Sequence, residues 1–166
     1  MKTKELVRYS IFLAAAVVAG YIEHLVLLPF LSGAKLGLAN SFGLIILYIY
    51  GRDKYIIFGL LRVLLSALLF TGFGTTFLIS LGGNILASIV TLLITCNKKV
   101  SIYGLSINGA IFHGIGQVIV VSIIYQTIAM INYAIILTIS GVISGFLMAL
   151  ITKTIITKLP NSIKNI

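Results

Sequence analysis

The stretch TTFLISLGGNILASIVTLLITC, residues 75–96, contains no charged side chain and decides the class of the fold. An apolar run of about twenty residues is long enough to cross the hydrocarbon core of a bilayer as a helix. Of all 166 residues, 60% are hydrophobic and 9% are charged, whereas a soluble domain usually carries about a quarter charged residues. The composition therefore predicts an all-α polytopic membrane protein. A transmembrane barrel would need alternating segments of about ten residues, and the sequence contains none.

Working outward from this stretch gives six candidate transmembrane helices in one domain that covers residues 1–166. The second and third of them are short for a full crossing, so they could be tilted, and the second could be a re-entrant loop. Glycine and polar residues separate the runs, as expected where apolar helices end. The predicted spans are residues 9–30, 36–50, 55–70, 75–96, 103–126 and 130–153.

The basic residues predict the orientation of these spans. If the N-terminus is cytoplasmic, the loops and tails on that side carry all the basic residues outside the spans except Lys35. This is the positive-inside pattern, so both termini of this cell-membrane protein are predicted to be cytoplasmic. The net charge of +9 does not indicate nucleic-acid binding, because the basic residues are spread over short loops and tails.

Two cations, Lys35 and Arg62, are not explained by this topology. Lys35 lies in a bend of small residues between the first two spans, and Arg62 lies inside the third. A charge at the bilayer centre costs about 3 kcal/mol even on insertion scales, so it usually marks a functional site. The alternative is a structural ion pair between Arg62 and Glu23. Such a pair would still leave Lys35, and hence a net positive cavity that prefers an anion.

The strongly polar side chains inside the spans lie between the predicted midplane and the outer face, which is expected for a cavity that opens outward. Each has a structural alternative. Asn40 could brace the start of the second span, and Asn84 could be a packing residue. His113 and Gln117, one helical turn apart, could form an interhelical hydrogen bond. The predicted substrate-binding residues are Glu23, Lys35, Asn40, Arg62, Asn84, His113 and Gln117.

Small residues and missing residue types complete the prediction. Ala15 and Ala19 form a flat face on the first span, which indicates close helix packing or docking of a partner membrane subunit. The chain has one aspartate, Asp53, and one cysteine, Cys96, so it offers no acidic magnesium site and no cysteine metal site. No catalytic residues, metal or cofactor are predicted. No ATP-binding loop occurs, so any energy must come from an ion gradient or another subunit.

Four motifs carry a family resemblance: GAKLGLAN at 33–40, LRVLL at 61–65, SLGG at 80–83 and HGIGQ at 113–117. With them the chain resembles the bacterial Gx transporter family, whose members are often labelled heptaprenyl diphosphate synthase component I. That family is similar to the substrate-binding S components of energy-coupling-factor transporters. The resemblance implies a six-span S-component-like bundle whose Ala15 and Ala19 face docks onto a scaffold subunit driven by ATPases.

Three functions are compatible with these features. The first is a substrate-binding membrane subunit for uptake of a small anionic compound, energised by a partner ATPase module. The alternative is a non-catalytic membrane accessory subunit of a heptaprenyl diphosphate synthase in isoprenoid or quinone metabolism. A proton-coupled carrier that uses Glu23 and His113 ranks third, because the chain lacks the internal repeat typical of such carriers.

Overall fold

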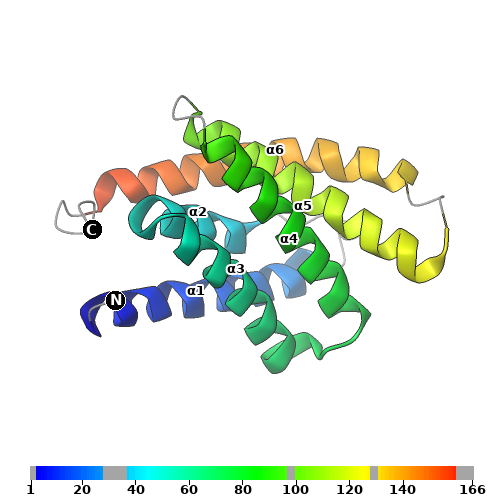
Figure 1. Ribbon diagram of the computed structural model, residues 1–166, viewed down its shortest axis with the longest axis horizontal. Helices are drawn as coiled ribbons and strands as arrows, with labels where there is room; N and C mark the ends of the chain where they lie inside the picture. The colour runs from blue at the N-terminus through cyan, green and yellow to red at the C-terminus, as the bar shows by residue number, and fades with distance from the viewer. Residues whose placement is uncertain (1–2, 28–36, 97–99, 128–130, 160–166) are drawn as a thin grey trace.

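The computed structural model of the chain is a bundle of helices (Figure 1), and it describes residues 3–27, 37–96, 100–127 and 131–159. Within these ranges no strand occurs, which confirms the predicted all-α class for the described part of the chain. The helices are α1 (Thr3–Leu27), α2 (Leu38–Tyr50), α3 (Arg52–Ser66), the π-helical segment η1 (Ala67–Thr71), α4 (Thr75–Thr95), α5 (Ile102–Tyr125) and α6 (Ile131–Lys158).

In the described part of the chain, five helical segments are long and apolar enough to cross a membrane. They lie in α1, α4, α5, α6 and the segment Arg52–Thr71, where α3 continues into η1. Five such segments indicate a multi-pass membrane protein, in agreement with the composition. α2 has only 13 residues and is about 20 Å long, shorter than the hydrocarbon core of about 30 Å. A sixth crossing through α2 and the cytoplasmic location of both termini stay predictions.

The third span is longer than predicted, because α3 begins at Arg52 and not at Tyr55. The charged residues before Tyr55 join the helix, and Asp53 lies in its first turn. A carboxylate there is favourable because it faces the positive end of the helix dipole. At the other end, η1 extends the segment to Thr71, and Gly72 ends it with a φ of 70°.

Glycines let the backbones of α4, α5 and α6 approach one another. A Cβ atom at Gly116 on α5 would lie 2.7 Å from the carbonyl oxygen of Gly82 on α4. A Cβ atom at Gly145 on α6 would lie 2.7 Å from the Cα atom of Ile107 on α5. Both distances are too short for any other residue, so these glycines pack helices together inside the bundle.

α2 lies at the centre of the bundle, packed against α1, α3, α5 and α6. Its Ile46 is fully buried in a cluster with Tyr9 and Ala16 of α1 and Phe58 of α3. The rings of Tyr9 and Phe58 meet edge to face at 5.6 Å between centroids, and the Tyr9 hydroxyl donates to the carbonyl oxygen of Lys54 at 2.9 Å. These contacts tie α1, α2 and α3 together near the N-terminus of α1.

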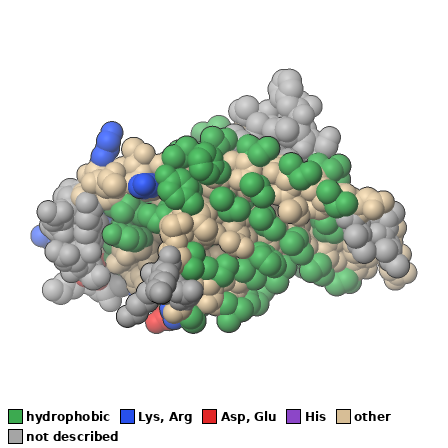
Figure 2. Space-filling view, turned by 90° about the horizontal axis from the view of Figure 1, so that it is seen from above, with side chains coloured by type: hydrophobic (Ala, Val, Ile, Leu, Met, Phe, Trp, Pro, Cys, Tyr) green, Lys and Arg blue, Asp and Glu red, His purple; other side chains and the backbone are tan. Residues whose placement is uncertain are grey.

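The surface separates apolar from charged side chains along the length of the bundle. Figure 2 shows hydrophobic side chains over the middle of the visible face and Lys and Arg side chains at one end of it. That end carries the N-terminus of α1 and the C-terminus of α6 (Figure 1). We call it the basic end; its described basic residues include Arg52, Lys54 and Lys158. An apolar middle with a charged end matches a membrane-embedded bundle.

Candidate functional site

A cavity of about 130 Å³ lies inside the bundle, and all six α-helices and η1 contribute to its wall. Four of its lining residues, Phe70, Thr71, Thr76 and Phe77, flank the turn between η1 and α4, at the end of α3 opposite to Arg52. The cavity is therefore displaced from the basic end. Five of the predicted site residues line it, namely Glu23, Asn40, Arg62, His113 and Gln117. We call it the Arg62 cavity.

The other two predicted site residues are Asn84 and Lys35. Asn84 lines a smaller adjoining cavity of about 40 Å³, which Asn40 and Arg62 also line. Lys35 lies outside the described residues, so its role stays a prediction. The structure thus brings six of the seven predicted residues to two adjoining cavities that share Arg62.

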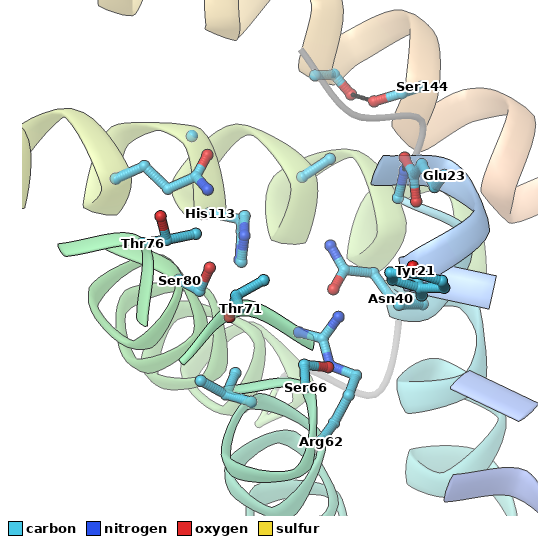
Figure 3. A pocket seen from close by; sticks show the side chains of 18 of the residues that line it. Tyr21, Glu23, Asn40, Arg62, Ser66, Thr71, Thr76, Ser80, His113 and Ser144 are labelled. Carbon is cyan, nitrogen blue, oxygen red and sulfur yellow. Dashed lines mark hydrogen bonds between the residues drawn. The ribbon is translucent and has the colours of Figure 1, made fainter. Parts of the chain in front are cut away.

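Arg62 on α3 carries the positive charge of the cavity. Figure 3 shows its guanidinium pointing into the same space as the side chains of Asn40 and His113. One of its nitrogens, Nη2, donates to Oδ1 of Asn84 at 3.3 Å, and Asn84 is 6% exposed. A Cβ atom at Gly59, one turn before Arg62, would lie 2.8 Å from that same Oδ1. Gly59 therefore makes the room in which Asn84 reaches Arg62.

Glu23 lines the same cavity but has a different partner. Its carboxylate accepts hydrogen bonds from the backbone N–H of Gly37 at 2.5 Å and of Leu38 at 3.1 Å. These groups form the N-terminus of α2, where a negative charge is favourable. In the described residues, Glu23 thus joins α1 to α2, and the hydrogen bond of Arg62 goes to a neutral amide. The ion pair expected as the structural alternative for Arg62 is not observed.

Asn40 lies in the first turn of α2, between Glu23 and Arg62 (Figure 3). The start of α2 has no side-chain cap, because Gly37 occupies the cap position with a φ of 81° and Glu23 supplies the acceptor. The bracing role considered for Asn40 is therefore filled by Glu23. The half-buried amide of Asn40 lines both cavities next to the guanidinium.

His113 and Gln117 are one turn apart on α5 and lie against α4. A Cβ atom at Gly83 would lie 2.9 Å from Cγ of Gln117 and 3.0 Å from Cε1 of His113. Gly83, the second glycine of the SLGG motif, therefore makes space for these two side chains. The packing interpretation and the site interpretation are both consistent with the structure, because the residues contact α4 and line the Arg62 cavity.

Several hydroxyl groups in the wall were not predicted as site residues. The hydroxyls of serines and threonines in apolar helices commonly donate a hydrogen bond to a backbone carbonyl of the preceding turn. Ser140 donates in this way to the carbonyl oxygen of Leu137 at 3.0 Å, and Ser144 donates to that of Gly141 at 3.4 Å. Two pairs of wall residues, Thr76 with Ser80 and Ser140 with Ser144, are four residues apart, and this helical spacing could have identified them in the sequence. The hydroxyl side chains in the wall, apart from Tyr21, are Ser66, Thr71, Thr76, Ser80, Ser140 and Ser144.

An aromatic pair forms another part of the wall. The rings of Tyr21 on α1 and Phe70 on η1 stack with centroids 4.0 Å apart and an angle of 16°. The π-helical turn of η1 brings Phe70 to this position, and π turns within helices are frequent at functional sites. The cavity thus combines a flat apolar wall with polar groups from five other segments.

The chemistry of the wall suits an anion. An arginine guanidinium, side-chain amides and hydroxyls are the donors that bind carboxylate and phosphate oxygens. The one carboxylate in the wall, Glu23, is engaged by the α2 backbone. Among the described residues, no group of three or more His, Cys, Asp or Glu could hold a metal ion. Direct binding of an anion by Arg62 is the simplest use of this arrangement.

The predicted docking face on α1 lies at the edge of the bundle. Ala15 and Ala19 are half-buried, whereas Ala16 between them is fully buried in the core. A Cβ atom at Gly20 would lie 3.4 Å from Cβ of Ala39 on α2, so the neighbouring small-residue stripe packs inside the bundle. A partner at Ala15 and Ala19 stays a prediction.

Comparison with protein families identifies the chain. Residues 12–155 match the family described as heptaprenyl diphosphate synthase component I, and this range contains every residue that lines the Arg62 cavity. The chain belongs to this family. Membership in the heptaprenyl diphosphate synthase component I family confirms the family label predicted from the four motifs. No curated protein and no solved structure matches the chain, so the likeness to S components stays a prediction.

Proposed function

We propose that this chain is a non-catalytic membrane component of a heptaprenyl diphosphate synthase system and that it binds a small anionic compound in the Arg62 cavity. The family description supports the association with the synthase. The Arg62 cavity supports the binding role, and it is the observation that carries the proposal.

A binding role fits the residues better than a catalytic one. The whole chain has three acidic residues, Glu5, Asp53 and Glu23. Asp53 lies in the first turn of α3 at the basic end, and Glu23 is bound to the start of α2. Magnesium-dependent diphosphate chemistry needs several carboxylate ligands at one place. The synthase activity is therefore assigned to a partner chain.

The anion is held by charge and by geometry together. The guanidinium has five N–H donors, and one of its nitrogens is directed to Asn84. The amides of Asn40 and Gln117 and the hydroxyls of the wall surround the same space. A cavity of about 130 Å³ is smaller than the usual range of about 300–1,000 Å³ for drug-sized ligands, so the compound is small.

Binding is tested with the purified protein in detergent and a panel of small anions, which includes inorganic diphosphate and small mono- and dicarboxylates. At least one anion is expected to raise the melting temperature of the wild type and to lose this effect in Arg62→Gln. Arg52→Gln is the matched control, because it removes an arginine from the other end of the same helix. If no anion stabilises the wild type, or if both variants lose the effect equally, the binding role is refuted.

Association with the synthase is tested separately. The chain is expressed together with the soluble prenyl diphosphate synthase of the same genome and purified through a tag on the membrane chain. A stoichiometric complex is expected, and it should persist in Arg62→Gln because the arginine is buried within the bundle wall. Elution of the membrane chain alone, with the synthase soluble and active without it, contradicts this part of the proposal.

A second candidate is a substrate-binding subunit for uptake of the anion. The position of the cavity favours it: the cavity lies away from the basic end, which the positive-inside pattern places in the cytoplasm. A ligand would then enter from the outer side, and a partner ATPase module would drive its release inward. Accumulation of the stabilising anion in cells that express the chain with such a module, but not with Arg62→Gln, supports uptake. Equal accumulation in both contradicts it.

A further inference from the structure

A third cavity, of about 360 Å³, lies at the basic end of the bundle. Apolar side chains of α2, α5 and α6 make up most of its wall, among them Leu44, Leu47, Leu105 and Ile156. Tyr48, which is 54% exposed, also lines it, so the cavity reaches the outer surface of α2. In a membrane this surface contacts lipid.

A fixed cation lies at this cavity. Arg52, the first residue of α3, lines the cavity and is exposed. Its Nη2 donates to the carbonyl oxygen of Thr95 at 2.7 Å, at the C-terminus of α4. This bond holds the guanidinium at the end of a helix, at the depth where phospholipid headgroups lie in a membrane. The remaining N–H groups of Arg52 can bind a headgroup phosphate.

We infer that this cavity binds an anionic membrane phospholipid. The headgroup phosphate lies at Arg52, and an acyl chain follows Leu44, Leu47 and Leu105. Two independent features support this occupant: an apolar wall and a cation at the basic end. A free small anion would leave the apolar wall empty, and a zwitterionic lipid would bring a cationic group to Arg52 together with its phosphate. The site shares no lining residue with the Arg62 cavity, so its test is independent of the test of the proposed function.

The chain contains no tryptophan, which allows a direct test with one introduced fluorophore. Tyr48→Trp reports from the cavity, and Leu6→Trp, at a position 54% exposed on α1 between Lys4 and Arg8, reports ordinary lipid contact beside basic residues. Each protein is placed in vesicles of phosphatidylcholine that contain either brominated phosphatidylglycerol or an equal share of brominated phosphatidylcholine. The bromine quenches fluorescence only where the lipid contacts the indole.

At Tyr48→Trp, brominated phosphatidylglycerol is expected to bind about fivefold more strongly than brominated phosphatidylcholine, because one arginine acts on an anionic headgroup. Adding Arg52→Gln should reduce this preference to the value measured at Leu6→Trp. Lys158→Gln, which removes another exposed cation of the basic end, should leave it unchanged.

Three results would overturn the inference. The first is an equal preference at Tyr48→Trp and Leu6→Trp in folded protein. The second is an equal loss in Arg52→Gln and Lys158→Gln, which would indicate attraction to the basic end as a whole. The third is relief of the quenching by a prenyl diphosphate added in stoichiometric amount, which would assign the cavity to that amphiphile. Thermal unfolding of each variant, measured in the same vesicles, confirms that the comparison concerns folded protein.

Discussion

Arg52 and Arg62 lie on one continuous helical segment about 15 Å apart, yet their surroundings are opposite. Arg52 is exposed at the basic end, where a backbone carbonyl accepts a hydrogen bond from it and solvent can reach its charge. Arg62 lies among apolar helices, where only the polar groups of its cavity can do so. The difference teaches that a cation at a helix end follows from topology, whereas a cation inside the bundle requires a built polar site.

The largest effect is expected from removing the interior cation. Arg62→Gln keeps a polar side chain of similar length but removes the charge-assisted bonds to the anion. The loss of anion affinity should be about 2–3 kcal/mol, or about 30- to 150-fold, in a binding titration. Arg52→Gln should change the same affinity by less than about twofold, because that arginine is far from the cavity and screened. Equal losses in the two variants would remove the distinction between them.

A smaller loss is expected when the charge of Arg62 is cancelled and the guanidinium is kept. Asn84→Asp places a carboxylate at the atom that already accepts from Arg62. The new ion pair should lower anion affinity about tenfold while the arginine stays in place. Asn84→Leu is the matched variant, since it removes the hydrogen bond without adding a charge and should lower affinity less than Asn84→Asp does. Similar affinities in these two variants would show that charge balance does not control the site.

A substitution at Gly59 gives a third test of the interior arginine, because it changes the room available to Asn84 without changing any charge. Gly59→Ala puts a methyl group against the buried side-chain amide of Asn84, which must shift to make room for it. Anion affinity should fall about threefold as the bond from Asn84 to Arg62 is displaced, with little change in the melting temperature. Gly51→Ala, where no atom lies within 4 Å but φ is 83°, should show the reverse pattern of lower stability and unchanged affinity. A lower melting temperature in both variants, with equal affinities, would contradict this assignment.

The sequence predicted the fold class well because composition alone fixes it. A chain that is 60% hydrophobic and carries positive charge in its loops has few alternatives to a helical membrane bundle. It predicted the start of α3 less well. In the sequence, Arg52 and Asp53 look like part of a polar turn. In the structure they form the first turn of α3, where the helix dipole favours Asp53 and the Thr95 carbonyl oxygen accepts a hydrogen bond from Arg52.

The candidate site was predicted in its residues but not in its pairings. Asn40, Arg62 and His113 line one cavity, as expected if polar side chains inside a membrane face the interior of the bundle, and their role in binding stays a prediction. The partner of Glu23 could not be predicted, since charge alone favours Arg62. The structure instead offers Glu23 two backbone N–H groups that the start of α2 leaves open. Which side chain binds such backbone N–H groups cannot be read from the pattern of residue types in the sequence.

The smallest expected effect concerns this pairing and sharpens the difference between the two carboxylate roles. Glu23→Gln keeps one acceptor oxygen in place of the two that the carboxylate uses, Oε1 for Gly37 and Oε2 for Leu38. The fold should therefore persist with a loss of about 1–2 kcal/mol, from one hydrogen bond and a weaker interaction with the helix dipole. Removing a negative charge from the wall of the Arg62 cavity should at the same time raise anion affinity about threefold. A drop in affinity would instead mean that Glu23 orients Arg62, as the ion-pair interpretation holds. Thermal unfolding and anion titration on one preparation therefore separate a carboxylate that holds a helix from one that holds an arginine.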